Sequence, residues 1–119
     1  MLEHYQHPRN VGILEEATAL GRAENTACGD ELELYLQIEG TRVSRARFRT
    51  FGCAASIAAG SVLTELVVGV SLDQAGQITS DQIAAALGGL PALKMHGSVL
   101  AAEALQAALE DHRRQSRDH

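Results

Sequence analysis

Two cysteines, an aspartate and a histidine carry the chemistry that this sequence offers. Cys28 and Asp30 are separated by one glycine, and Cys53 and His96 follow further along the chain. Thiolate, carboxylate and imidazole groups form the ligand set that a soft or borderline metal ion prefers. The spacing matches no standard zinc-finger pattern, and a lone cysteine in a small domain is usually a buried apolar residue. The residues alone therefore leave a metal site or a reactive-thiol site as one hypothesis beside a purely structural role.

The strand signals begin after Asp30. Residues 31–39 alternate between apolar and polar side chains, as a half-buried strand does, and residues 45–49 alternate again after a Gly-Thr turn. These two stretches predict an antiparallel hairpin, which residues 50–52 would extend into a further short strand. Residues 13–30 lack a clear period and are expected to run over the surface.

Helix signals follow Cys53. Residues 54–68 are apolar on most sides, which predicts a largely buried helix. The amino-terminal end of that helix would favour the thiolate form of Cys53, because the helix dipole and the free amides stabilise negative charge. His96 lies near the start of a last helix predicted over residues 94–112, and residues 113–119 are expected to form a disordered tail.

Two capping-box patterns, Ser71–Gln74 and Thr79–Gln82, predict the starts of two short helices. Strands followed by helices indicate an α+β fold, in which the helices pack on one face of a small antiparallel sheet of about three strands. The 119 residues fit a single domain, residues 1–119, with a core of its own.

Composition excludes several classes of function. The net charge of −5 argues against nonspecific binding of nucleic acid. The longest apolar stretch, residues 54–70, is interrupted by polar side chains and is too short to span a membrane. The first residues contain no apolar segment typical of a signal peptide, so we expect a cytoplasmic protein with reduced thiols rather than a secreted domain with one disulfide.

Arg45, Arg47 and Arg49 form a basic stripe on one face of the second strand of the hairpin. Glutamates of the first strand can lie opposite this stripe, which would make it a solvated, ion-paired face. A docking surface for a partner protein is the alternative interpretation.

Several motifs, in order along the chain, resemble the NifU/IscU-type scaffold family for iron–sulfur clusters. The motifs are His7-Pro8-Arg9-Asn10-Val11-Gly12, Ala27-Cys28-Gly29-Asp30, Arg47-Phe48-Arg49-Thr50-Phe51-Gly52-Cys53-Ala54-Ala55-Ser56 and Lys94-Met95-His96. The resemblance extends from about residue 4 to residue 108. It implies a SufE/NifU-like fold with a small antiparallel sheet flanked by helices.

The resemblance also implies a function and a site. The family accepts sulfur from a cysteine desulfurase, holds iron, and builds or passes on a 2Fe–2S cluster. By position, Cys28 and Cys53 are similar to the first two family cysteines, Asp30 to the aspartate that tunes cluster release, and His96 to the neighbouring histidine. Lys94 matches a family lysine close to the site. The implied cargo is a 2Fe–2S cluster or iron, with zinc as a substitute metal.

Gly97 departs from the family pattern. The family has its third cysteine directly after the histidine, and that cysteine is regarded as a cluster ligand and the main sulfur acceptor. Glycine supplies neither a ligand nor a nucleophile, so four donors remain, enough for tetrahedral zinc or a mixed-ligand cluster. We expect Gly97→Cys to be tolerated near a helix start unless Gly97 has a positive φ, and to increase cluster formation.

Three functions are therefore open. The chain is expected to be a non-enzymatic iron–sulfur scaffold or carrier, a metal-binding regulatory relative that assembles no clusters, or a relay that carries persulfide on Cys28 or Cys53. The expected partners are a cysteine desulfurase and recipient apo-proteins, with neither nucleic acid nor membrane, and the expected state is a monomer or weak homo-oligomer. A dedicated chaperone is left open, because Ala92 stands where the IscU branch has a second proline in the segment that its chaperone recognises.

Overall fold

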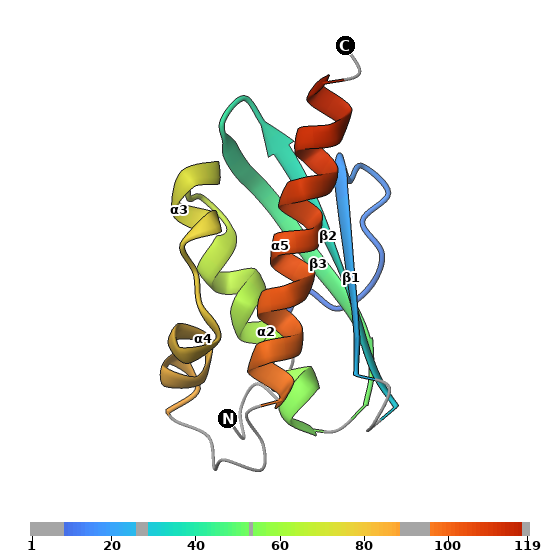
Figure 1. Ribbon diagram of the computed structural model, residues 1–119, viewed down its shortest axis with the longest axis vertical. Helices are drawn as coiled ribbons and strands as arrows, with labels where there is room; N and C mark the ends of the chain where they lie inside the picture. The colour runs from blue at the N-terminus through green and yellow to red at the C-terminus, as the bar shows by residue number, and fades with distance from the viewer. Residues whose placement is uncertain (1–8, 26–28, 53, 89–95, 118–119) are drawn as a thin grey trace.

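The computed structural model describes residues 9–25, 29–52, 54–88 and 96–117. In these ranges the strands are β1 (Ala19–Asn25), β2 (Asp30–Glu39) and β3 (Arg42–Phe51), and the helices are α2 (Ala54–Val67), α3 (Leu72–Gly76), α4 (Ser80–Ala86) and α5 (His96–Arg117). The strands form an antiparallel sheet in the order β1-β2-β3. Helices α2 and α5 pack on one face of this sheet; α4 contacts both of these helices, and α3 contacts α5 (Figure 1). The predicted α+β fold is confirmed.

The core lies between the sheet and helices α2 and α5. Leu32, Leu34 and Leu36 alternate along β2 and are fully buried, as the sequence pattern predicts. Phe48 of β3 is also buried, and its ring lies directly against Gly60 of α2, where a β-carbon would come within 2.5 Å of the ring. A side chain at that position would therefore push α2 away from the sheet.

The third strand is β1, and its position differs from the prediction. Residues 19–25, expected to run over the surface, pair with the whole first part of β2, whereas residues 50 and 51 only continue β3. The buried face of β1 consists of Ala19, Gly21 and Ala23, since the backbone of α5 lies directly against Gly21 at Ala104 and Ala108. Small residues on the buried face weaken the apolar alternation by which a strand is recognised.

Helix α5 extends to Arg117, beyond the predicted end at residue 112. The expected disordered tail from residue 113 is therefore wrong as far as residue 117. Arg113 pairs with Glu110 at 3.0 Å, and the side-chain amide of Gln115 donates to Asp111 at 2.9 Å. Such pairs, three or four residues apart, stabilise the last turns of α5, which carry no apolar side chains to bury.

The two capping boxes are confirmed. The Ser71 hydroxyl accepts a hydrogen bond from the Gln74 amide at 3.1 Å, and the Thr79 hydroxyl accepts one from Gln82 at 3.2 Å. In both cases the glutamine side chain accepts a hydrogen bond from the amide of the cap residue. None of the helices in the described ranges is long and apolar enough to cross a membrane.

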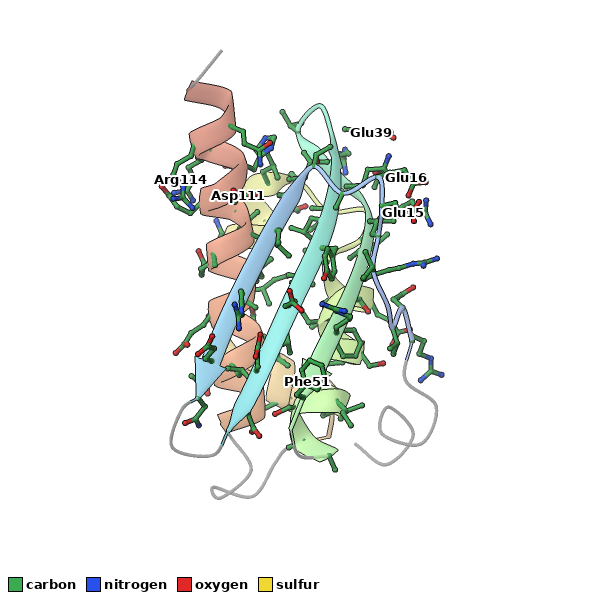
Figure 2. The ribbon with its side chains drawn as sticks, turned by 90° about the vertical axis from the view of Figure 1, so that its right-hand side faces the viewer. Glu15, Glu16, Glu39, Phe51, Asp111 and Arg114 are labelled. Carbon is green, nitrogen blue, oxygen red and sulfur yellow. The ribbon has the colours of Figure 1, made fainter. Side chains whose placement is uncertain are left out.

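Figure 2 turns the outer face of the sheet toward the viewer. The arginine stripe lies on this face, because Arg45, Arg47 and Arg49 alternate with the buried residues of β3. Arg49 donates to Glu33 across the strand pair at 2.7 Å, and this hydrogen bond raises the pKa of the guanidinium above its ordinary value. Arg47 donates to the carbonyl of Ile13 at 3.3 Å. The expected ion-paired face is thus present at Arg49. The alternative of a docking surface stays a prediction.

Candidate metal or cluster site

Four elements meet at one end of the molecule, the lower end in Figure 1. They are the start of β2, the end of β3, and the amino-terminal ends of α2 and α5. Asp30 is the first residue of β2, and Gly52 follows the end of β3. The two helices direct the backbone amides of their first turns and the positive ends of their dipoles toward this region, which favours negatively charged ligands there.

Asp30 is buried at this meeting point, with only 5% of its surface exposed. The hydroxyl of Ser56, in the first turn of α2, donates to one carboxylate oxygen at 3.2 Å. Gly52 lies against the other oxygen, since a β-carbon there would be 2.5 Å from Asp30 Oδ1. The carboxylate is therefore held between the first turn of α2 and the glycine that follows β3.

Gly97, the second residue of α5, lies against the first turn of α2. A β-carbon at this position would be 2.7 Å from the carbonyl carbon and oxygen of Ala55 and 2.9 Å from the amide nitrogen of Ser56. Gly97 is absent from the glycines with positive φ. The expectation that a side chain here costs little is nevertheless wrong, because the obstacle is the neighbouring backbone rather than the φ angle.

Ser56 of α2 contacts both β2 and α5 in this region. Its hydroxyl contacts Asp30 on β2, and its amide nitrogen lies beside Gly97 on α5. The sequence indicates Ser56 only as a polar interruption of an apolar helix. Ser56 lies in the first helical turn after the candidate ligand Cys53. A serine at this position could have predicted a hydrogen bond from its hydroxyl to a neighbouring ligand.

The other predicted ligands are described only in part. Cys28, Cys53 and Lys94 lie outside the described residues, as does the side chain of His96, which begins α5. The sequence neighbours of these ligands are described, and they lie at the four strand and helix ends that meet here. These neighbours are Gly29, Gly52, Ala54 and Gly97. Convergence of the predicted ligands on one site stays a prediction.

The donor set fits a metal ion or a cluster in its chemistry. The described side chains contain no group of three or more histidine, cysteine, aspartate or glutamate residues that could hold a metal ion. This is expected, since Asp30 is the one predicted ligand whose side chain falls inside the described ranges. A buried carboxylate beside a helix amino terminus needs compensation for its lost hydration, which Ser56 supplies in part.

Ser98 is a second buried hydroxyl near this site that the sequence did not single out. It follows Gly97 on α5, is fully buried, and has no hydrogen-bond partner for Oγ among the described residues. Such a group is uncommon in protein interiors. No sequence pattern distinguishes it from other serines in helices.

Comparison with known proteins places the whole chain in one group. A family model described as the NifU-like N terminal domain matches residues 1–119. The iron-sulfur cluster assembly scaffold protein IscU 1 of Archaeoglobus fulgidus is 45% identical over 116 residues, which are 98% of this chain and 76% of that protein. The scaffold protein IscU of Aquifex aeolicus is 40% identical over 114 residues, 94% of this chain and 73% of that protein.

A longer relative and the solved structures agree with this grouping. The nitrogen fixation protein NifU of a Nostoc species is 41% identical over 121 residues, and this chain spans 40% of its length. A putative scaffold protein for the SUF system from Fervidobacterium islandicum superposes with a TM-score of 0.74 at 20% identity, covering 91% of this chain and 92% of that one. A NifU-like amino-terminal structure from Brucella abortus gives a TM-score of 0.70 at 20% identity, covering 99% and 92%. These structures support the fold.

Proposed function

This chain belongs to the family of NifU-like N-terminal domains, and from that premise we propose that it is a scaffold or carrier for iron–sulfur clusters. The proposed ligands are Cys28, Asp30, Cys53 and His96, with Lys94 beside them. The proposed cargo is a 2Fe–2S cluster or iron, and zinc is the proposed substitute metal. The relatives named as iron-sulfur cluster assembly scaffold proteins support the scaffold role.

The observation that carries the proposal is the burial of Asp30 between Gly52 and Ser56. A carboxylate with only 5% of its surface exposed has lost most of its hydration, and the hydroxyl of Ser56 replaces part of it. Its position places an oxygen donor within the region where the chain neighbours of both cysteines meet. Asp30 is therefore proposed as a ligand that can leave or return to the cargo.

Gly97 favours a carrier over an assembler. The backbone of Ala55 occupies the space that a side chain at position 97 would need. In this chain sulfur from a desulfurase would have to be accepted by Cys28 or Cys53. We propose that the native protein binds preformed clusters more readily than it builds them, and that a metal-binding regulatory role is the second candidate.

The proposed partners and this chain have separate roles. A cysteine desulfurase would carry out the chemistry, this chain would supply ligands without being an enzyme, and recipient apo-proteins would take the cluster. A cytoplasmic location with reduced thiols belongs to the same proposal, since thiolates are required as ligands.

Metal binding provides the test. Purified protein is titrated with zinc under reducing conditions, beside a variant in which Cys28 and Cys53 are both serine. We expect the native protein to bind zinc and the variant to lose most of its affinity, because serine is a poor zinc ligand. Equal affinity in the two proteins, with unchanged circular dichroism, would overturn the proposed site.

A further inference from the structure

Strand β1 forms one edge of the sheet, with β2 as its single neighbour among the described strands. The amide of Leu20 donates to a carboxylate oxygen of Asp111 on α5 at 3.0 Å, so the main chain of Leu20 points away from β2. Main-chain groups two residues apart on a strand point to the same edge. The amides and carbonyls of Arg22 and Glu24 therefore point to the free edge of β1.

This part of the edge is exposed. Arg22 and Glu24 are exposed residues that alternate with the buried residues of β1. Within the described part of the chain, no main-chain hydrogen bond outside the sheet involves either of them. In Figure 2, α5 projects beyond β1 at the level of Asp111 and passes behind the sheet further down. Beyond the amide of Leu20, which Asp111 occupies, the edge thus offers two amides and two carbonyls to another strand.

The side chains at this edge are self-complementary. Charged residues on an edge strand usually keep other strands away. In an antiparallel pairing of β1 with β1 of a second copy, about a twofold axis at Ala23, Arg22 of each copy lies directly opposite Glu24 of the other. The neighbouring registers, centred on Arg22 or on Glu24, would place like charges opposite each other, which is unfavourable. The charges therefore permit one register.

Main-chain hydrogen bonding favours the same register. Pairing about Ala23 uses the amide and the carbonyl of both Arg22 and Glu24 in each copy, so every one of these open groups gains a partner. Arg22 contacts Glu24 of its own strand at 3.0 Å and also contacts Glu31 of β2. On pairing, Arg22 keeps Glu31 and exchanges its own Glu24 for that of the second copy. No charge loses its partner.

We propose that two copies of this chain associate through β1, so that their three-stranded sheets join into one continuous antiparallel sheet. The main chain supplies the attraction, and the alternating charges select the register. An interface of this small size is typical of a weak, transient dimer.

The proposed dimer also fixes the spacing of the two candidate sites. Ala23 lies two residues before Asn25, which pairs with Asp30 of β2. With the usual rise of a strand and the usual distance between strands, Asp30 of one copy would lie roughly 20 Å from Asp30 of the other. The inference is independent of the proposed cluster function, since the interface uses none of the proposed ligands, and it is tested on metal-free protein.

The first experiment uses the native chain with a chelator and a reductant. Sedimentation equilibrium is measured from about 10 μM to about 1 mM, and amide hydrogen exchange is measured at both ends of this range. We expect a monomer–dimer equilibrium, together with slower exchange of the Arg22 and Glu24 amides at the higher concentration. A chain that stays monomeric at 1 mM, or a dimer in which these two amides exchange as fast as in the monomer, would overturn the proposal.

Charge variants test the register. Arg22→Glu and Glu24→Arg each place like charges opposite each other, so each variant alone should dimerise about tenfold more weakly than the native chain. An equimolar mixture should associate about as well as the native chain, because the two glutamates of one variant face the two arginines of the other. Both variants keep a net negative charge, so overall attraction between the two chains cannot explain such a recovery.

Arg45→Glu is the matched control, because Arg45 is a similarly exposed, carboxylate-paired arginine on β3, and this variant should dimerise like the native chain. Circular dichroism checks that the variants fold, and the exchange measurement on the native chain remains decisive if one does not. A mixture of Arg22→Glu and Glu24→Arg that stays monomeric, or association that neither substitution weakens, would show that the β1 register is wrong. Concentration-dependent protection confined to another surface would identify a different interface and would also contradict the proposal.

Discussion

A β-carbon on Gly97 would lie 2.7 Å from the carbonyl oxygen of Ala55. This relationship fixes how closely the start of α5 approaches the start of α2. It also gives the departure from the family pattern a physical consequence, since the missing cysteine is accompanied by a helix contact that leaves no room for one. The same contact brings α5 beside Ser56 and so beside the carboxylate of Asp30.

We predict that Gly97→Ala lowers stability by about 1–3 kcal/mol, because the added carbon forces the two helix starts apart. Thermal and urea unfolding measure the change. Gly76→Ala is the matched control: Gly76 is also helical but has only an ordinary 3.9 Å contact with Leu109, and alanine there should be neutral or stabilising by up to about 1 kcal/mol. Equal stability changes would contradict the close helix approach.

Gly97→Cys is expected to share the loss of stability of Gly97→Ala. Any gain in desulfurase-dependent cluster yield over the native chain would then be due to the new thiol, since Gly97→Ala carries the same packing change without it. Equal yields in all three proteins would mean that Cys28 or Cys53 already accepts sulfur efficiently, and the carrier interpretation of Gly97 would be wrong.

Gly52→Ala should weaken zinc binding through Asp30. The new methyl group would meet Asp30 Oδ1 and push the carboxylate out of its position. Gly40→Ala is the control, because Gly40 also has a positive φ, at the hairpin turn, but no neighbour within 4 Å. Both variants should lose stability through backbone strain, whereas zinc affinity should fall in Gly52→Ala alone. An equal fall of zinc affinity in both variants would contradict a specific role of Asp30 in zinc binding.

Ser56→Ala should reduce zinc affinity by about tenfold, the usual cost of removing a hydrogen-bond partner of a ligand. The Ser56 hydroxyl is the described donor to the Asp30 carboxylate. Ser44→Ala is a suitable control, since the Ser44 hydroxyl also donates one hydrogen bond, to the Gln37 carbonyl, away from the site. Competition with a chromophoric chelator measures both affinities, and an unchanged affinity in Ser56→Ala would argue that Asp30 is not a ligand.

Zinc affinity should also fall as the pH is lowered. Protons compete for the thiolates of Cys28 and Cys53 and for the imidazole of His96, so binding releases protons. Calorimetric titrations in buffers of different ionisation enthalpy count these protons. A pH-independent affinity would exclude thiolate and imidazole ligands.

The sequence predicted those parts of the fold in which pattern and packing agree. The β2–β3 hairpin has large apolar residues on its buried face, so its alternation is visible, and the capping boxes at Ser71 and Thr79 are local patterns that need no tertiary information. Strand β1 was missed because its buried face consists of alanine and glycine. Small residues are required on this face because the backbone of α5 lies directly against Gly21, a contact that the sequence alone does not show.

The candidate site divides in the same way. Asp30 and the element ends around it follow from motifs along the chain, whereas the contacts of Ser56 and Gly97 are made between residues far apart in sequence. Gly97 is the clearest case. Its φ angle is not positive and so does not require glycine, and the obstacle to a side chain is the carbonyl of Ala55 on another helix. Close backbone contacts of this kind leave no periodic trace in a single sequence.

Anaerobic reconstitution of the native chain tests the central claim most directly. The protein is incubated with ferric iron and sulfide, passed through a desalting column, and analysed for visible absorption, iron and acid-labile sulfide, beside the variant in which Cys28 and Cys53 are both serine. The account predicts an iron–sulfur absorption band and equal amounts of iron and sulfide in the native protein, and neither in the variant. A folded native protein that retains no iron and sulfide, or a variant that keeps the band, would contradict it.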